Sequence, residues 1–423
     1  SGSGTGDPSA AFSGTLRAGE SHIIDILDVV GIGDNWVGSA YVSANQSIGV
    51  VAERYKNADN MLVTNVGNPV DSFRTDQTYA SLVFQDYNFW NTGISVANLS
   101  DAPNTVTVTF HGPTNHGQFA RTIQLAPRAM DFIFIPGQQE LGVDDDGFVG
   151  SAVITSESGR AFHAAIDQVK YYGSGGDVGH AMSYIAEHAT AGDGNPQVAV
   201  NDALALPIFS KGNNAGNGDT SGIQLFNVSA DHSVNAHIIF YDQSGARVAP
   251  TIDTARSVSL APRESHTVYA LHMPTMPDNF WGSAVIQVSG DGELVAVSNN
   301  VNYDVANDGS VTYNLIRVPG EPVDATATWA EVDPVSDTNV WGDTHDLTVT
   351  VYDQFDEPMA GVGVSASITE GPHRNYSESS DVLSGTTGPD GTVVLSYTGG
   401  NIHHGLSHDV ITIDVDGISG PLV

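Results

Sequence analysis

The chain of 423 residues contains no cysteine. It can therefore form no disulfide bond, no thiolate nucleophile and no cysteine-ligated zinc site. Its stability must come from hydrophobic cores. The length is sufficient for two to four domains, and an apolar content of 40% is enough to fill their interiors.

Positive charge is scarce. The chain has 14 Lys and Arg residues against 49 Asp and Glu residues, and lysine occurs only at Lys56, Lys170 and Lys211. Binding to nucleic acids or anionic membranes depends on clustered basic residues, so neither partner is expected. A net charge of −35 suits either a saline environment, where counterions screen self-repulsion, or a calcium-rich exterior. We favour the saline, halophilic interpretation.

Long apolar runs are also missing. No run approaches the ~20 residues that a membrane-spanning helix needs, so we expect no transmembrane segment. The first residues, SGSGTGDPSA, are typical of a processed chain, which favours a secreted, extracellular or cell-surface location. Asn-x-Ser sequons predict glycosylation of an exported protein at Asn45, Asn98, Asn227 and Asn375.

A seven-residue motif occurs three times: DNWVGSA from Asp34, DGFVGSA from Asp146 and DNFWGSA from Asp278. Similar segments precede each copy, namely LRAGESHIIDI, LAPRAMDFIFI and LAPRESHTVYA. The second and third copies also share upstream segments, since GISVANLS resembles GIQLFNVS. Internal similarity of this kind indicates repeated modules.

The repeats are predicted to be all-β. Segments such as NTVTVTF alternate apolar and polar residues, and clusters of Gly, Pro, Asn and Asp separate them. We predict tandem antiparallel β-sandwich modules at 76–192 and 198–320, a partial module at 1–75 and a C-terminal immunoglobulin-like sandwich at 325–423. The partial module would leave an open sheet edge. It could pack on the next module, be completed by another part of the chain, or be completed by a neighbouring molecule.

The motif itself has two interpretations. Alternation puts the aromatic residue, the glycine and the following alanine on one face of a strand. The pairs concerned are Trp36 and Gly38, Phe148 and Gly150, and Phe280 and Gly282. We favour core packing over an aromatic platform for sugars, because the order of large, absent and small side chains is typical of a closely approached core face.

The C-terminal segment carries a second pattern. VTVYDQFDEPMAGVGVSA reads as two strands joined by a tight polar turn, and TTGPDGTVVLSYT as a turn followed by a strand. These segments resemble the bacterial immunoglobulin-like group 1 domains of invasin- and intimin-type surface proteins, although Asp356 stands where glycine is usual. The resemblance covers about 325–423. It implies a seven-stranded sandwich that serves as an extracellular spacer or adhesive unit, without catalysis.

Few residues suggest a chemical site. Asp144, Asp145 and Asp146 could bind calcium, but they lack the spacing of a helix–loop–helix calcium site, and a solvated acidic turn explains them as well. The histidines His403, His404 and His408 lack a metal-site pattern. No cofactor is required by any motif. Without a nucleophile elbow or a phosphate-binding loop, we expect no enzymatic activity.

The sequence therefore predicts an exported structural protein that assembles with itself, head to tail, into a surface filament, pilus-like fibre or surface layer. Strand addition between subunits is one route to such an assembly. The alternative is an adhesin or virion fibre that binds glycans or a host receptor through exposed aromatic residues such as Trp90 and Trp329.

Overall fold

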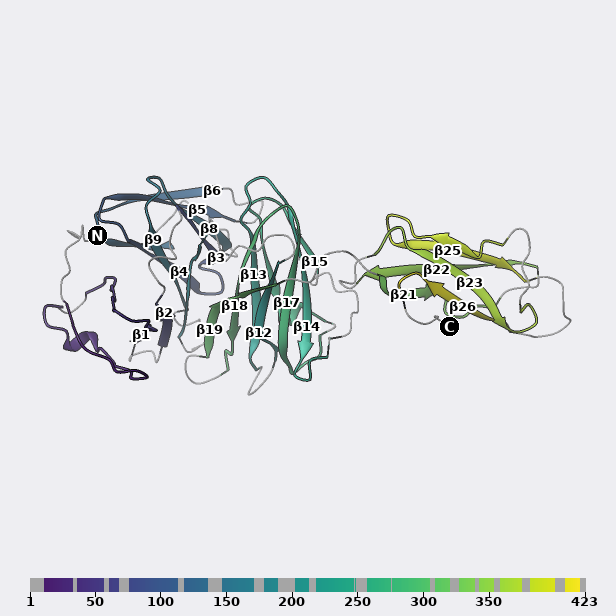
Figure 1. Cartoon of the computed structure of the whole chain (residues 1–423), viewed down its shortest axis with the longest axis horizontal. Helices are drawn as coiled ribbons and strands as arrows, with labels where there is room; N and C mark the ends of the chain where they lie inside the picture. The colour runs from purple at the N-terminus through teal and green to yellow at the C-terminus, as the bar shows by residue number, and fades with distance from the viewer. Residues whose placement is uncertain are drawn as a thin grey trace. The chain divides into compact units, whose positions relative to one another are not determined.

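A computed structural model of the chain divides it into two compact units, Ser1–Glu321 and Pro322–Val423. The structure describes residues 11–32, 36–56, 61–67, 76–112, 118–135, 147–170, 179–188, 202–212, 218–246, 248, 257–274, 276–304, 309–319, 327–338, 342–353, 358–374, 381–399 and 408–418. The prediction of an all-β fold built from antiparallel sandwiches is confirmed (Figure 1). We call residues 1–75, 76–192 and 198–320 the first, second and third repeats.

The second repeat contributes two antiparallel sheets, with the strand orders β11-β3-β8-β5-β6 and β10-β9-β4-β7. The second motif copy begins β8, and GISVANLS lies in β4. The strands are β3 Gln77–Gln85, β4 Trp90–Asn98, β5 Asn104–His111, β6 Gln118–Leu125, β7 Met130–Phe134, β8 Phe148–Ser156, β9 Phe162–Lys170, β10 His180–Ile185 and β11 Glu187–His188.

The third repeat has the same plan, with the strand orders β15-β14-β17-β12-β20 and β16-β13-β18-β19. The third motif copy begins β17, and GIQLFNVS lies in β13. A short 3-10 helix, η5 Ala270–His272, follows β16. The strands are β12 Asp202–Lys211, β13 Thr220–Asn227, β14 Val234–Asp242, β15 Ser257–Leu260, β16 Ser265–Tyr269, β17 Phe280–Gly290, β18 Leu294–Val301, β19 Ser310–Asn314 and β20 Ile316–Pro319.

Each of these repeats buries one core between its two sheets. In the second repeat, Phe110 and Ile154 of one sheet meet Ile94 and Ile166 of the other, and all four are almost fully buried. The alternation seen in the sequence sets this arrangement, because successive side chains of a strand point to opposite faces. Burial of such aliphatic and aromatic side chains is the main source of stability in a chain without disulfides.

The first repeat departs from the prediction. The strands expected within residues 16–26 and 36–42 are wrong, since the described residues there contain only the 3-10 helix η1 Ile26–Asp28. What folds as β structure is a hairpin of β1 Val51–Lys56 and β2 Met61–Val66. In the second repeat, β7 pairs with β4, and β8 pairs with β3 and β5. The described part of residues 1–75 contains no counterparts of β3, β4 or β5, so the segments at 16–26 and 36–42 have no neighbouring strand there to pair with.

The C-terminal unit is a sandwich of two three-stranded sheets, β21-β22-β25 and β24-β23-β26, around one core. Its described residues hold six strands, where the immunoglobulin-like resemblance implies seven. The segments at β22 and β23, predicted as neighbours across a turn, belong to opposite sheets. The strands are β21 Ala327–Asp333, β22 Thr344–Asp353, β23 Gly363–Glu370, β24 Ser384–Thr386, β25 Thr392–Thr398 and β26 Val410–Val415.

Candidate functional site: the contacts between repeats

The repeated motif is a packing feature in the second and third repeats. A side chain at Gly150 would collide with the backbone oxygen of His111 in the neighbouring strand β5. A side chain at Gly282 would collide with the equivalent oxygen of Tyr241 in β14. The ring two residues earlier lies over each glycine and is itself buried, as the rings of Phe148 and Phe280 are.

The first copy of the motif keeps only part of this geometry. The ring of Trp36 lies over Gly38, as in the other copies, but among the described residues Gly38 belongs to no strand, and its nearest neighbours are atoms of Trp36 rather than of a paired backbone. Trp36 is 38% exposed, whereas its counterpart Phe148 is 2% exposed. Asp34 and Asn35 lie outside the described residues. The local contact between the aromatic ring and the glycine thus forms without the sheet around it.

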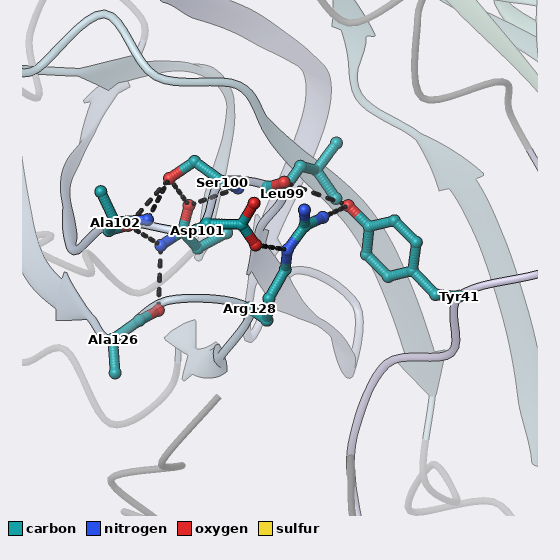
Figure 2. A network of polar contacts seen from close by, with 8 residues as sticks. Tyr41, Leu99, Ser100, Asp101, Ala102, Ala126 and Arg128 are labelled. Carbon is teal, nitrogen blue, oxygen red and sulfur yellow. Dashed lines mark hydrogen bonds and ion pairs between the residues drawn. The ribbon is translucent and has the colours of Figure 1, made fainter. Parts of the chain in front are cut away.

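Two of the predicted glycosylation sites are structural turns. The side chain of Asn98 is buried, and its Nδ2 donates to the carbonyl oxygens of Ala102 and Ala126 at 2.8 and 2.9 Å. The hydroxyl of Ser100 donates to its Oδ1 (Figure 2). Because Nδ2 is the atom that would carry a glycan, the folded structure does not admit one there.

Asn227 repeats this arrangement in the third repeat. Its buried Nδ2 donates to the carbonyl oxygens of His232, Leu260 and Ala261. The prediction of glycans at Asn98 and Asn227 is therefore incompatible with the folded chain. Asn45 is exposed and remains a predicted acceptor, and Asn375 lies outside the described residues.

The second and third repeats meet through an apolar contact. Tyr79 of β3 and Val153 of β8 lie on the outer face of their sheet, and they pack against the outer face of β13 and β18. The third-repeat side chains in this buried cluster are Phe226, Val228 and Val295. The rings of Tyr79 and Phe226 meet edge to face at 6.3 Å. Such a contact joins the two repeats as tightly as an ordinary core.

Polar groups surround this apolar contact. Asn314 of β19 donates to the backbone oxygen of Ile185 at 2.9 Å, and the hydroxyl of Ser310 donates to the backbone oxygen of Ala181 at 3.2 Å. The indole nitrogen of Trp90 donates to the hydroxyl of Tyr303 at 2.9 Å. Trp90 is thus buried in the contact between repeats and cannot serve as the exposed glycan-binding residue that the sequence suggested.

A buried carboxyl group lies in the same contact. Glu187 of β11 accepts a hydrogen bond from the hydroxyl of Ser81 at 2.8 Å. Burial raises the pKa of Glu187 to about 8, against the opposing effect of hydrogen bonds from Ser81, Asn314 and the backbone of Ala296. Two of these groups belong to the third repeat. The uncharged form of Glu187 is therefore the form that suits the joined repeats at neutral pH.

The first repeat contacts the second at the equivalent position. The hydroxyl of Tyr41 donates to the backbone oxygen of Leu99 at 3.2 Å, and Arg128 both hydrogen-bonds to Tyr41 and covers its ring (Figure 2). Tyr41 follows Gly38 by three residues, as Val153 follows Gly150. Leu99 follows Asn98, as Val228 follows Asn227. The same pair of positions thus makes both contacts.

The hairpin β1–β2 adds polar contacts to the second repeat (Figure 1). Arg54 forms a bidentate ion pair with Asp167 of β9, with 2.7 Å between Nη1 and Oδ2. The hydroxyl of Ser183 in β10 donates to Asn65 at 3.0 Å. Of the three outcomes considered for the partial module, packing against the second repeat is the one present in the described residues.

The structure does not test the predicted metal ligands. Asp144, Asp145 and Asp146 lie outside the described residues, as do His403 and His404. The part of the chain that the structure describes contains no group of three acidic or histidine side chains able to hold an ion. The remaining histidine of that group, His408, is exposed. In the third motif copy, Asp278 instead forms an ion pair with Lys211 at 3.2 Å.

Sequence reasoning missed Glu187, Tyr41 and the inter-repeat contacts. Glu187 lies in the segment YIAEHA, and no neighbouring residue in that segment indicates that its side chain is buried. Its hydrogen-bond partners Ser81 and Asn314 come from the distant strands β3 and β19. Trp329, the second predicted glycan-binding aromatic, is half-buried and stacks on Tyr352 at 4.2 Å within the C-terminal unit. No helix in the described residues has the length and apolar character needed to cross a membrane.

Comparison with known proteins gives little. No family model matches the chain, and no curated protein matches it. A solved structure of the surface layer protein SbsC, domains 1–6, matches with 10% sequence identity and a TM-score of 0.18. The match covers 82% of this chain and 52% of that chain, so the chain spans about half the length of that structure. A TM-score this low supports no argument about fold or function.

Proposed function

We propose that this chain is an exported, non-catalytic structural protein that assembles with copies of itself into a surface filament, fibre or layer. The observation that carries the proposal is the exposed apolar surface of the first repeat. Ile23, Leu27 and Val30 are 90%, 86% and 93% exposed. These three side chains are close together in the sequence, and exposed apolar residues that gather in one region mark sites of association, because their hydration is unfavourable.

The outer face of the second repeat supports the same proposal, because it is less completely covered than the outer face of the third repeat. In the third repeat, where the second repeat covers it, every residue of β13 is buried. In the second repeat the matching strand β4 has half-buried residues at Asn91, Ser95 and Ala97, all on its outer face. Phe132 and Phe134 of the neighbouring β7 are exposed. The first repeat therefore covers the second less completely than the second covers the third.

Charge sets the conditions for assembly. Copies with a net charge of −35 repel one another at low ionic strength, and the Debye length falls from ~10 Å at 0.1 M salt to ~3 Å at 1 M. Apolar association also strengthens in the presence of excluded salts. Assembly is therefore expected to increase with salt concentration. The C-terminal unit, by its immunoglobulin-like resemblance, serves as a spacer or adhesive terminus.

Sedimentation velocity of the full chain in 0.1 M and 2 M salt, with electron microscopy of the same samples, tests the proposal. We expect large species in high salt and fewer in low salt. A variant with Ile23→Ser, Leu27→Ser and Val30→Ser should remain smaller. Val335→Ser is the matched control, since Val335 is 86% exposed in the C-terminal unit. A wild-type chain that stays monomeric under all these conditions contradicts the proposal.

A glycan-binding adhesin or virion fibre remains the second candidate, and one feature favours it. A pocket of about 420 Å³ in the third repeat is lined by Tyr269, Tyr303, Thr220 and Asp278, among other residues. Aromatic faces and hydroxyl groups are suited to sugars. Saturable signal on a glycan array, reduced by Tyr269→Ala, would favour this function over assembly.

A further inference from the structure

The contacts between repeats follow one rule. In each contact, the residue three positions after the motif glycine lies against the next repeat, close to the Asn-x-Ser turn. That turn ends strand β4 in the second repeat and strand β13 in the third. Val153 of the second repeat shares one buried cluster with Val228 of the third, and the hydroxyl of Tyr41 in the first repeat donates to the backbone oxygen of Leu99 in the second. In both contacts, the residues that follow the motif glycine thus lie against the outer face of the following repeat.

In the third repeat, the corresponding residues have no further repeat to cover them in Ser1–Glu321. Val285 of β17 is the counterpart of Val153. It pairs across the sheet with Ala205 on one side and Ile239 on the other, and Ala205 pairs with Ile316. Cross-strand partners share a face, so these four residues form one uncharged row, which we call the leading row.

Ile316 is the exposed member of the leading row, and Val285, Ala205 and Ile239 are half-buried, whereas Val153 and Tyr79 at the places of Val285 and Ala205 are buried. Ile316 is 61% exposed, whereas Glu187, which pairs with Tyr79 at the matching place in the second repeat, is 7% exposed. Trp281 of β17 is 49% exposed. It lies on the same face of the strand as Val285. An exposed tryptophan beside aliphatic side chains is typical of the energetic centre of a protein interface.

The first repeat presents the complementary surface. Val51 pairs with Val66, and Tyr55 pairs with Leu62, so these four side chains share one face of the hairpin, which we call the hairpin face; Glu53 and Thr64, which pair between them, lie on the same face. Val66 is 62% exposed and Tyr55 is 57% exposed. The opposite face of the hairpin carries Arg54, which contacts the second repeat.

By chain order, β1 and β2 correspond to β18 and β19 of the third repeat. Each pair follows its repeat's copy of the motif along the chain, and each is an antiparallel hairpin. In the third repeat the second repeat covers the outer face of this hairpin, and Val295, Val297 and Val301 of β18 are buried there. The hairpin face of the first repeat therefore corresponds to the outer face of the β18–β19 hairpin, which the second repeat covers.

We propose that the leading row of one molecule packs against the hairpin face of a second copy, in a head-to-tail contact that repeats the one between the second and third repeats. The proposal rests on the self-assembly proposed above. Two contacts of this kind form within the chain, and Ile316 of the leading row and the four side chains of the hairpin face are exposed in the described residues. Because the two surfaces differ, the contact is heterologous and gives an open polymer when its rotation does not close.

Single substitutions in the full chain test each surface. Ile316→Asp places a charge in the leading row, and Val66→Asp places one in the hairpin face. Each is expected to raise the protein concentration at half-assembly by about tenfold or more in high salt, as for a central interface residue. Val394→Asp in β25, which also replaces an exposed valine, is the matched control. Unchanged circular dichroism and melting temperature establish that each variant folds.

A mixture of the two variants gives a sharper result. The intact hairpin face of Ile316→Asp can bind the intact leading row of Val66→Asp, and the product has no surface left for growth. We expect a one-to-one dimer in the mixture and monomers in each variant alone. Assembly that persists unchanged in both variants overturns this inference while leaving self-assembly in place. A monomeric wild type overturns the proposed function as well.

Discussion

The two contacts within the first 321 residues use the same positions and differ in how much they cover. Between the second and third repeats, a complete sheet lies on a complete sheet, and Tyr79, Val153 and Phe226 are buried. Between the first and second repeats, the described contact comprises Tyr41, a few polar pairs and one buried apolar side chain, Met61, which lies against Gly179. A repeat that lacks its upstream strands keeps the docking position but loses the apolar area that makes docking strong.

The largest expected effect is the difference in the free energy of unfolding between substitutions at two motif glycines, Gly282 and Gly38. Gly282→Val places a side chain against the backbone oxygen of Tyr241 in a paired strand, which cannot move without breaking the sheet. We expect a loss of about 3–5 kcal/mol in the free energy of unfolding. At Gly38→Val the nearest atoms belong to the partly exposed ring of Trp36 and not to a paired strand, so the substitution should cost less than about 1 kcal/mol. Urea denaturation of both variants measures the difference, and equal losses would contradict the comparison.

The next effect concerns the contact between the second and third repeats, where Glu187 makes the stability of the protein depend on pH. The pKa of Glu187 is about 8 in the folded protein, above its ordinary value of 4.5. Between these values the folded protein holds a proton that the unfolded chain releases, so the stability of the wild type falls as pH rises from 4.5 to 8 and is then level. Glu187→Gln removes this dependence.

At pH 8.5 the Glu187→Gln variant should exceed the wild type by on the order of 2–4 kcal/mol, with little difference at pH 4. Thermal unfolding across this pH range provides the measurement. Glu157→Gln, at an exposed position, is the control and should follow the wild type at every pH. A difference that does not change with pH would show that Glu187 acts by packing alone.

The smallest effect concerns the contact of the first repeat. The side chain of Arg54 is 51% exposed, and exposed ion pairs contribute little. Arg54→Ala should cost less than about 1 kcal/mol, and its effect should shrink further in 2 M salt. Hydrogen exchange of the β1–β2 amides should become faster, while exchange in β13 stays unchanged. Faster exchange in β13 would mean that the first repeat supports the third.

Alternating residues and repeated segments predicted the all-β sandwiches, since period-two patterns and turn residues act locally. The resemblance of GISVANLS to GIQLFNVS likewise marks strands β4 and β13, which occupy matching places in their sheets. The failure at residues 16–26 and 36–42 has a physical cause. A strand-like pattern gives the side-chain alternation but not the partner strand, and a single strand has no hydrogen bonds to hold it.

Burial was the property that the sequence could not supply. Trp90 and Glu187 look exposed in a local reading, and both lie inside the contact between repeats. Lys170 and Lys211, two of the three lysines, are buried as well. Such residues are fixed by partners from distant parts of the chain, and nothing in their own neighbourhood records those partners.

The Asn-x-Ser turns at Asn98 and Asn227 have a consequence for the timing of biosynthesis. Each asparagine uses its side-chain nitrogen to hold its turn closed. An oligosaccharyltransferase could therefore reach these sites only before β4 and β13 take their places, and a modified molecule could not close the turn. Glycan occupancy at these two asparagines would therefore measure the rate of glycosylation relative to the rate of folding. A fully folded population would carry no glycan at either site.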